Sequence, residues 1–329
     1  MVDLLVSIVN TDRRALLKQC LDTLPAAVGS LSAVVVVLDN ASRDGSADMV
    51  DAYEPPVTLI RQDSRRGFAA NHNRVMKEHA GSSRYVLLLN EDTEADPGSL
   101  ERMVRYMDQH PRVGITGARL VYSDGRPQSS YAAFPSVLDE LLYVWAVGRL
   151  VPKHLRPKLK RVAEPVRRWL PAMTATYLSN WTSDHREPQA VDWVCGACFM
   201  VRREVIEEIG LLDEAFFIYF EETDWCKRAA ASGWKTVHVP EARVQHHEAA
   251  SRGRLSTLAF QRSGCRYFAK HGRSVDKYLF RLGVWLNAGV MIGCTSVAWL
   301  LRPSQRKANE YAMQTYWEVL RDRSALGAG

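Results

Sequence analysis

Acidic side chains follow two of the apolar segments in the first part of the chain. Asp39 comes directly after the run 33–38, and Glu91 and Asp92 come soon after the run 85–89. A carboxylate can accept a hydrogen bond from the N3–H of a pyrimidine, and it can also chelate a divalent ion together with a diphosphate. Either loop alone is equally typical of a solvated turn. Together they predict a site for a nucleotide diphosphate and a metal ion.

A third acidic cluster, Glu221-Glu222-Thr223-Asp224, follows an aromatic run. Aromatic surroundings can raise the pKa of a carboxyl, which suits a general base that takes a proton from a hydroxyl group. On a helix, Glu221 and Asp224 share a face while Glu222 points about 100° away, so the three acids have different roles. The alternative is a solvated helix start favoured by the helix dipole.

The segment Arg65-Arg66-Gly67 lies between the first two acidic loops. It offers two guanidinium groups and a glycine turn that opens a helix, and both features suit phosphate. We therefore expect this segment to contact a diphosphate.

Predicted strands and helices alternate through the first part of the chain. The strands are expected at 4–9, 33–38, 57–60 and 85–89, and the helices at 13–24, 46–52 and 69–79. Asp96 can cap a further helix with Pro97 at its first position. Strands so uniformly apolar are buried on both faces, which predicts an α/β fold with a mostly parallel, Rossmann-like sheet flanked by helices. Ligands of such sheets collect at the carboxyl ends of the strands, where the acids lie.

Composition narrows the class of protein. With 47% hydrophobic and 24% charged residues, the 329-residue chain is typical of a folded enzyme, and its net charge of +6 favours phosphate-rich ligands or anionic lipid. Six scattered cysteines and a strand-like start favour a reducing cytoplasm. Cys195 and Cys198 are interpreted as small buried thiols, because no second cysteine pair completes a zinc site.

Two later regions suggest contact with a membrane. Basic and apolar residues alternate over 150–170, which is typical of a helix on anionic lipid or of a solvated helical face. Binding to nucleic acid is disfavoured, because no nucleic-acid-binding motif accompanies the charge. Leu282 to Leu301 contains no charge and is long enough to cross a bilayer. Basic residues flank both of its ends, which favours an in-plane or re-entrant segment; a helix buried on protein is the alternative.

The order of these motifs resembles family 2 glycosyltransferases, especially the bacterial rhamnosyltransferase-like branch that builds cell-surface polysaccharides. The resemblance covers most of residues 4–255. The motifs that carry it are Val6-Ser7-Ile8-Val9-Asn10-Thr11, Asp39-Asn40-Ala41-Ser42, Gly67-Phe68-Ala69-Ala70-Asn71, Asn90-Glu91-Asp92-Thr93, and the segments 191–198, 216–224 and 244–247. It implies a GT-A fold.

The resemblance implies a role for each candidate residue at the nucleotide and the metal. Asp39 would bind the base, and Asp92 would be the surviving carboxylate of an Asp-x-Asp metal motif. His246 would be a further ligand of the metal or the diphosphate, with His247 as the alternative. The metal implied is Mg²⁺ or Mn²⁺. Further contacts to the nucleotide sugar are expected from Asn10, Thr11, Asn40, Arg66, Gly67, Asn71, Asn90 and Glu91.

The resemblance also implies the reaction. The family uses the second acid of the 221–222 pair as catalytic base, so Glu222 is expected in that role, with Glu221 and Asp224 as catalytic neighbours. The reaction would be a single displacement that inverts the sugar's configuration. The favoured donor is dTDP-L-rhamnose, and the favoured acceptor is a lipid-linked saccharide at the cytoplasmic membrane face.

The resemblance suggests domain boundaries as well. Residues 1–265 would be the catalytic domain, with a nucleotide-binding half at 1–120 and an acceptor half at 121–265 that holds a variable helical insertion at about 128–190. Residues 266–329 would form a helical region that associates with the membrane through 282–301.

The same residues leave alternatives to this assignment. No residue distinguishes rhamnose from galactose or glucose, so a UDP-hexose donor stays open. A catalytically impaired membrane-bound partner is also open, because Glu222 and Asn90 depart from the family's usual Asp. A nucleotidyltransferase is disfavoured, because 6–17 lacks a glycine-rich phosphate loop.

Overall fold

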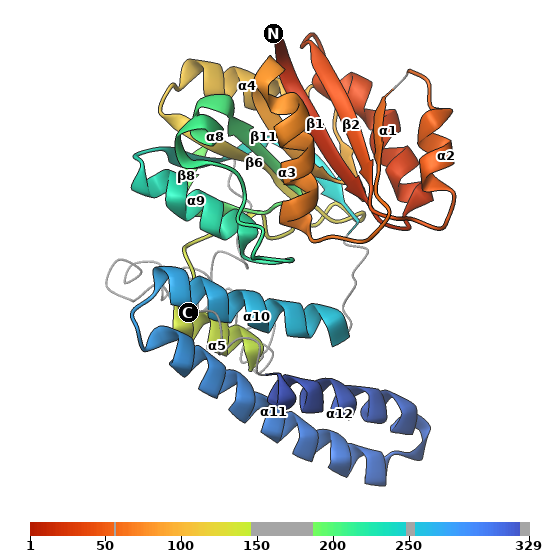
Figure 1. Ribbon diagram of the computed structural model, residues 1–329, viewed down its shortest axis with the longest axis vertical. Helices are drawn as coiled ribbons and strands as arrows, with labels where there is room; N and C mark the ends of the chain where they lie inside the picture. The colour runs from red at the N-terminus through yellow and green to blue at the C-terminus, as the bar shows by residue number, and fades with distance from the viewer. Residues whose placement is uncertain (56, 146–186, 248–253, 323–329) are drawn as a thin grey trace. The chain divides into compact units, whose positions relative to one another are not determined.

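The computed structural model describes all residues except 56, 146–186, 248–253 and 323–329 (Figure 1). The described chain forms two compact units. The first contains 1–134, 187–217 and 221–247, and the second contains 135–145, 218–220 and 254–322. The basic series at 153–168 and most of the expected insertion lie outside the described residues.

A nine-stranded sheet forms the centre of the first unit as far as the structure describes it. Its strands are β1 (Val2–Asn10), β2 (Ala33–Asp39), β3 (Thr58–Arg61), β4 (Ser83–Asn90), β5 (Thr93–Ala95), β6 (Val113–Val121), β8 (Gln189–Val191), β10 (Cys198–Arg202) and β11 (Lys235–His246). The order is β3-β2-β1-β4-β10-β6-β11-β5, and β8 also pairs with β11. The first four strands are parallel, whereas β10 is antiparallel to β4 and β6. β7 (Tyr131–Ala132) and β9 (Trp193–Val194) form a separate pair.

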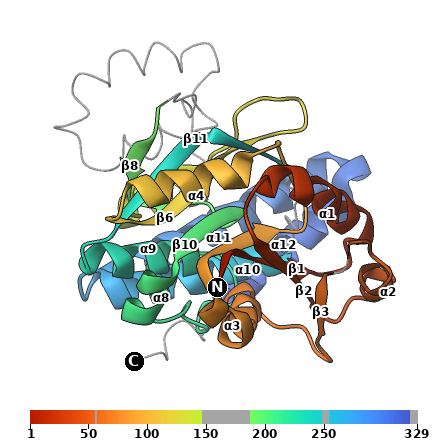
Figure 2. The ribbon, with the colours of Figure 1, turned by 90° about the horizontal axis from the view of Figure 1, so that it is seen from above.

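Helices cover both faces of this sheet (Figure 2). One face carries α1 (Arg14–Val28), α2 (Ser46–Asp51) and α4 (Ser99–Gln109), and the other carries α3 (Phe68–His79), α8 (Arg203–Ile209) and α9 (Glu221–Ala231). The central strand β4 supplies both cores, because successive side chains point to opposite faces: Leu87 and Leu89 join the first, and Val86 and Leu88 the second. The predicted α/β sheet flanked by helices is therefore confirmed.

The predicted start of α4 is wrong. The helix begins at Ser99, and the residue before it is Gly98, whose φ of 70° suits glycine. The carboxylate of Asp96 instead forms an ion pair with Arg243 of β11, with 2.8 Å between Oδ2 and Nη1. The Asp96 side chain, predicted to cap the helix, is thus used in a tertiary ion pair instead.

The second unit is helical. It contains α5 (Val137–Val144), α10 (Arg254–His271), α11 (Asp276–Leu301), the short helix η3 (Pro303–Gln305) and α12 (Arg306–Arg321). Helix α10 runs across position 265, where the sequence suggested a boundary. Of the helices in the described residues, α11 is long and apolar enough, by length and composition, to cross a membrane.

Candidate active site

Polar residues from distant parts of the sequence meet at one edge of the sheet. The strands β1, β2 and β4 run parallel and end at Asn10, Asp39 and Asn90. β11 also ends at this edge, at His246, because it runs parallel to β6, and both β4 and β6 are antiparallel to β10. The edge therefore collects the acids that the sequence placed after separate strands.

The carboxylate of Asp39 is buried and held by its neighbours. Its Oδ2 accepts a hydrogen bond from Ser42 N at 3.0 Å, and its Oδ1 lies 3.4 Å from Asn10 Nδ2. Asn10 is fully buried and also donates to Ser42 Oγ at 3.1 Å. Asn10 therefore holds the Asp39 loop in place.

Asn40 shapes the neighbouring turn in the same way. Its Oδ1 accepts from Arg66 N at 2.8 Å, and its Nδ2 donates to Thr11 Oγ1 at 3.1 Å and to Arg66 O at 3.2 Å. Asn71, on α3, donates to the same Arg66 carbonyl at 3.2 Å. Asn40 and Asn71 are buried, whereas Arg66 is exposed. The buried amides thus fix the backbone that presents the Arg66 side chain.

A hollow of about 740 Å³ opens beside these loops. It is lined by Asp12, Ala41, Ser42, Arg43, Gln62, Asp63, Ser64 and Arg65. Asp12 and Ala41 both have left-handed backbones, with φ of 53° and 56°, which is uncommon outside glycine and concentrates at functional sites. The volume is within the usual range of small-molecule sites.

Asp92 and His246 face one another across the end of the sheet. Asp92 Oδ1 lies 3.3 Å from His246 Nε2, and Asn90 Nδ2 lies 3.5 Å from the same nitrogen. The pairing of β5 with the end of β11 produces this contact, because Thr93 is in register with His246. Earlier in β11, between Val239 and Arg243, the register of its pairing with β6 shifts.

Gln128 orients the His246 ring. Gln128 Oε1 lies 2.8 Å from His246 Nδ1, so it accepts the Nδ1–H and leaves the Nε2 lone pair directed toward Asp92. Asp92 Oδ1 and His246 Nε2 both carry lone pairs, and at 3.3 Å the two atoms would both stabilise a cation held between them. Two ligands of one ion, each about 2.1 Å from it at a right angle, are about 3 Å apart. The pair therefore fits a divalent cation.

His247 has a different partner. Its Nε2 lies 2.5 Å from Glu94 Oε1, while its backbone N–H donates to Asp92 O at 2.9 Å. The structure thus brings His246, and not His247, to the Asp92 carboxylate. Glu91 lies beside this pair, and burial, together with the charge of Asp92, raises the pKa of Glu91 to about 7.

The Glu222 carboxyl lies against Gly196. A Cβ added to Gly196 would lie 3.6 Å from Glu222 Oε1 and 3.5 Å from the Phe68 ring. The other oxygen, Oε2, is inaccessible to solvent and has no hydrogen-bond partner among the described residues, although the side chain as a whole is half-buried. Burial raises the pKa of Glu222, and backbone N–H groups, including that of Gly196, oppose the increase. An unpaired carboxyl oxygen of this kind is able to take a proton.

Glu221 and Asp224 are more deeply buried than Glu222; the Oε2 of Glu221 is likewise unpaired among the described residues, whereas Asp224 has a charged partner. Glu221 is buried, and burial plus the nearby charge of Glu222 raises its pKa well above the ordinary value. Asp224 is fully buried and pairs with Arg228, with 2.8 Å between Oδ2 and Nε. Arg228 also donates to the carbonyls of Ile209 and Leu211 at 2.7 and 2.8 Å. Asp224 therefore anchors the loop before α9.

The model of the family described as glycosyl transferase family 2 matches residues 5–210. This chain belongs to glycosyltransferase family 2. The N-acetylglucosaminyl-diphospho-decaprenol L-rhamnosyltransferase of Mycobacterium tuberculosis is 29% identical to this glycosyltransferase over 231 residues, which are 67% of this chain and 68% of the relative. The O-antigen biosynthesis protein RfbC of Myxococcus xanthus is 26% identical over 221 residues, 67% of this chain but 15% of RfbC.

Two solved structures share the fold. The mannosyltransferase PcManGT from Pyrobaculum calidifontis, in complex with GDP-Man and Mn²⁺, has a TM-score of 0.51 at 16% identity and spans 100% of this chain and 76% of its own. GalNAc-T7, solved with UDP, GalNAc and Mn²⁺, has a TM-score of 0.56 at 14% identity, and the match spans 97% of this chain and 56% of the GalNAc-T7 chain. These likenesses confirm the GT-A fold of this glycosyltransferase.

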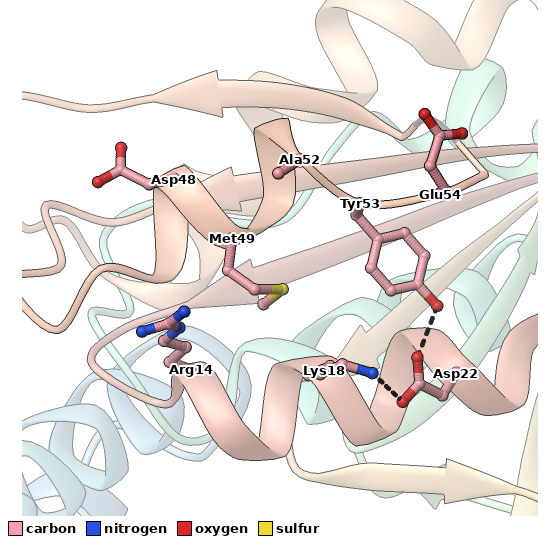
Figure 3. Close-up of a pocket in the computed structure, with 8 residues that line it drawn as sticks. All are labelled: Arg14, Lys18, Asp22, Asp48, Met49, Ala52, Tyr53 and Glu54. Atoms are coloured by element: carbon pink, nitrogen blue, oxygen red, sulfur yellow. Dashed lines mark hydrogen bonds and ion pairs between the residues drawn. The ribbon is translucent and has the colours of Figure 1, made fainter.

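A second hollow of the glycosyltransferase lies between α1 and α2 (Figure 3). Its volume is about 440 Å³. Three of its polar side chains pair with one another, because Asp22 accepts from Lys18 at 2.7 Å and from the Tyr53 hydroxyl at 2.9 Å. None of its lining residues belongs to the edge described above, so we assign it no part in the reaction.

Two contacts of the candidate site were not predicted from the sequence. Gln128 is separated from every motif, and no local pattern marks it as the partner of His246. Gly196 lies in the segment 191–198, but its role as a support for Glu222 depends on the packing of α9. Within the described residues, no group of three or more His, Cys, Asp and Glu side chains could hold a metal ion; the candidate centre has two, with Asn90 beside them.

Proposed function

We propose that this enzyme transfers a sugar from a nucleotide diphosphate to an acceptor hydroxyl by a single displacement, with inversion. The observation that carries the proposal is the Glu222 side chain, which is only half-buried and has an unpaired Oε2 among the described residues, whereas Glu221, whose Oε2 is also unpaired, is buried. Glu222 would take the proton of the acceptor hydroxyl as that oxygen attacks the anomeric carbon. The bond to the nucleotide diphosphate breaks, and the diphosphate leaves with the electron pair.

Asp92 and His246 would hold a divalent cation, Mg²⁺ or Mn²⁺, with Asn90 beside them. Both structural neighbours were solved with Mn²⁺, and the 3.3 Å separation of the two side chains suits ligands of one ion. When bound, such a cation would neutralise charge on the departing diphosphate. With few protein charges on the ion, we expect weak metal binding in the absence of the donor.

The remaining residues would bind and orient the donor. Asp39 would accept from the base beside the 740 Å³ hollow, and Arg66 would reach the diphosphate from the turn that Asn40 and Asn71 hold. We assign this donor role to 1–120 and acceptor binding to 121–265. Asn10, Thr11, Asn40 and Asn71 act as positioning residues in this scheme.

The favoured donor is dTDP-L-rhamnose, and the favoured acceptor is a lipid-linked saccharide at the cytoplasmic membrane face. This assignment is supported by the name of the mycobacterial relative, an L-rhamnosyltransferase that acts on a decaprenol-linked sugar. A UDP-hexose donor is the second candidate, because GalNAc-T7 was solved with UDP. A panel of nucleotide sugars, measured for Mn²⁺-dependent binding and transfer, distinguishes the two donors.

Glu222→Gln tests the proposed base. The amide cannot accept the proton, so transfer should fall by about 10² to 10⁴, while nucleotide binding with Mn²⁺ stays close to wild type. Glu222→Asp should retain more activity than Glu222→Gln because it keeps the carboxyl. Near-normal turnover of Glu222→Gln would contradict the assignment. A wild-type protein that binds nucleotide but never transfers or hydrolyses any sugar would instead favour the catalytically impaired partner.

A further inference from the structure

An apolar stripe runs along the exposed side of α11. We call it the α11 stripe. Its large members recur at helical spacings and are about half exposed or more: Leu279, Leu282, Leu286, Val290, Val297, Leu300 and Leu301. Gly289, Gly293 and Cys294 are exposed between them, and 282–301 contains no charged residue. Soluble proteins rarely expose a continuous apolar surface of this extent, so the stripe calls for a partner.

The opposite face of α11 is already packed within its own unit. Phe280, Val284 and Ala288 are buried there, and a Cβ on Gly283 would lie 2.7 Å from Cδ1 of Leu141 in α5. The side chain of Trp145 donates to the Gly283 carbonyl at 3.2 Å. The first half of α11 therefore offers one face to a partner, unlike a helix that lipid surrounds.

Helix α12 folds back along the second half of α11 (Figure 1). Trp299 Nε1 donates to Glu310 Oε1 at 2.9 Å, and the Arg306 guanidinium lies 4.7 Å from the centre of the Trp299 ring. Besides Arg306 and Glu310, α12 carries the charged residues Lys307, Glu318 and Arg321. If α11 crossed a bilayer, α12 would bring these charges into the hydrocarbon, where they are costly. The packing thus favours an orientation along the membrane surface.

Both ends of the α11 stripe are basic. Lys277 lies at the start of α11, and exposed Arg302, Arg306 and Lys307 follow its end. Anionic lipid headgroups complement this charge at both ends. A second copy of the chain is disfavoured, because two stripes placed together in either direction would bring basic ends next to each other.

We propose that the α11–α12 hairpin is a monotopic anchor. The α11 stripe enters one leaflet of a bilayer that contains anionic lipid, with the helix axis along the membrane plane and neither helix crossing it. The inference rests on the proposed function only for the membrane location of the acceptor.

Flotation of the full-length chain with vesicles tests this anchor. We expect binding to vesicles of phosphatidylcholine with phosphatidylglycerol, and weaker binding to phosphatidylcholine alone or in high salt. Leu286→Glu combined with Val290→Glu should weaken binding by more than about ten-fold. Leu138→Glu is the matched control, because Leu138 on α5 is 49% exposed, against 56% for Leu286, and lies off the stripe.

Cysteine labelling distinguishes lying along the membrane from crossing it. Cys294 lies on the stripe and is exposed, so vesicles should slow its reaction with a membrane-impermeant maleimide. Ser304→Cys, made with Cys294→Ser, places a thiol in the exposed connection to α12, and it should still react from outside the vesicles.

Four results would overturn the anchor: no flotation of the wild type with anionic vesicles, equal flotation of the stripe variant, protection of Ser304→Cys, or a lipid-free dimer that the stripe variant dissociates. Nucleotide binding with Mn²⁺ is measured on the same variants and should be unchanged. If every form, including the wild type, failed to bind any nucleotide, the proposed function would be contradicted and the anchor would not.

Discussion

Gly67 packs directly on the backbone of Phe217. A Cβ at Gly67 would overlap the Phe217 carbonyl oxygen and lie 2.8 Å from its Cα, and Phe68 N donates to that same oxygen at 2.8 Å. Gly67 follows Arg66 in the turn assigned to the diphosphate, and Phe217 lies shortly before Glu222 in the chain. This contact therefore ties the turn at the donor to the segment that leads to the proposed base.

Gly67→Ala should separate these two segments, because the new methyl group meets backbone atoms that cannot rotate away. We expect transfer to fall by about 10²-fold, as for other small displacements of reacting groups, with a smaller effect on nucleotide binding. Gly81→Ala is the control, since a Cβ there meets no atom within 4 Å. Equal activity of the two variants, measured as kcat and KM, would show that the contact has no catalytic role.

His246→Ala and His247→Ala should differ sharply in metal binding. His246 faces Asp92, whereas His247 faces Glu94. His246→Ala should weaken Mn²⁺ binding in the presence of nucleoside diphosphate, with a matching rise in the Mn²⁺ concentration needed for activity. His247→Ala should change neither quantity much. Titration of Mn²⁺ by paramagnetic resonance measures both variants, and the reverse pattern would transfer the ligand role to His247.

Gln128→Leu tests the orientation of the His246 ring. Loss of the 2.8 Å contact with Nδ1 leaves the ring free to rotate and to change tautomer. Changes of this kind next to a metal ligand usually cost about 10- to 100-fold in metal affinity or activity. We expect that loss in the Mn²⁺ titration, with the overall fold unchanged by circular dichroism. Wild-type affinity in this variant would remove Gln128 from the site.

The pH dependence of kcat/KM should report the ionisation of Glu222. Burial raises the pKa of Glu222, and the base is inactive when protonated, so activity should fall as the pH decreases through a value above the ordinary glutamate pKa of about 4.3. The pKa of Glu221 is raised further by the charge of Glu222, so Glu222 ionises first. Glu221→Gln should therefore leave this loss of activity at acidic pH unchanged. A large shift in the pH at which the loss occurs would assign it to Glu221.

Glu221→Gln should also change stability in a pH-dependent way. The folded chain holds the Glu221 proton to a higher pH than the unfolded chain, because burial raises its pKa. The wild type therefore loses stability as the pH rises from the unfolded glutamate pKa of about 4.3 to the raised folded pKa, and the full loss persists above it. Urea unfolding should show that the variant gains stability relative to wild type as the pH rises. A difference in the free energy of unfolding that does not change with pH would show that the raised pKa of Glu221 is not its cause.

Asp224→Asn should affect folding more than chemistry. Breaking a buried ion pair costs about 3 kcal/mol, and Arg228, the partner of Asp224, also holds two carbonyls before α9. We expect a lower free energy of unfolding, measured in urea, while activity below the unfolding transition stays within about ten-fold of wild type. A variant that folds stably but is inactive would show that Asp224 acts in catalysis.

The sequence by itself determined the alternation of strands and helices, the acids at the exits of β2 and β4, and the acidic start of α9. These features depend on local periodicity and on residue types that are read within one segment. Only the tertiary structure decided which of these groups meet. Asp92 reaches His246 because β5 pairs with β11, Gln128 orients that histidine from another loop, and Asn10 and Asn40 turn inward to support neighbours. Such contacts join segments far apart in the chain, where strand register and side-chain packing set the geometry and local spacing carries no record of it.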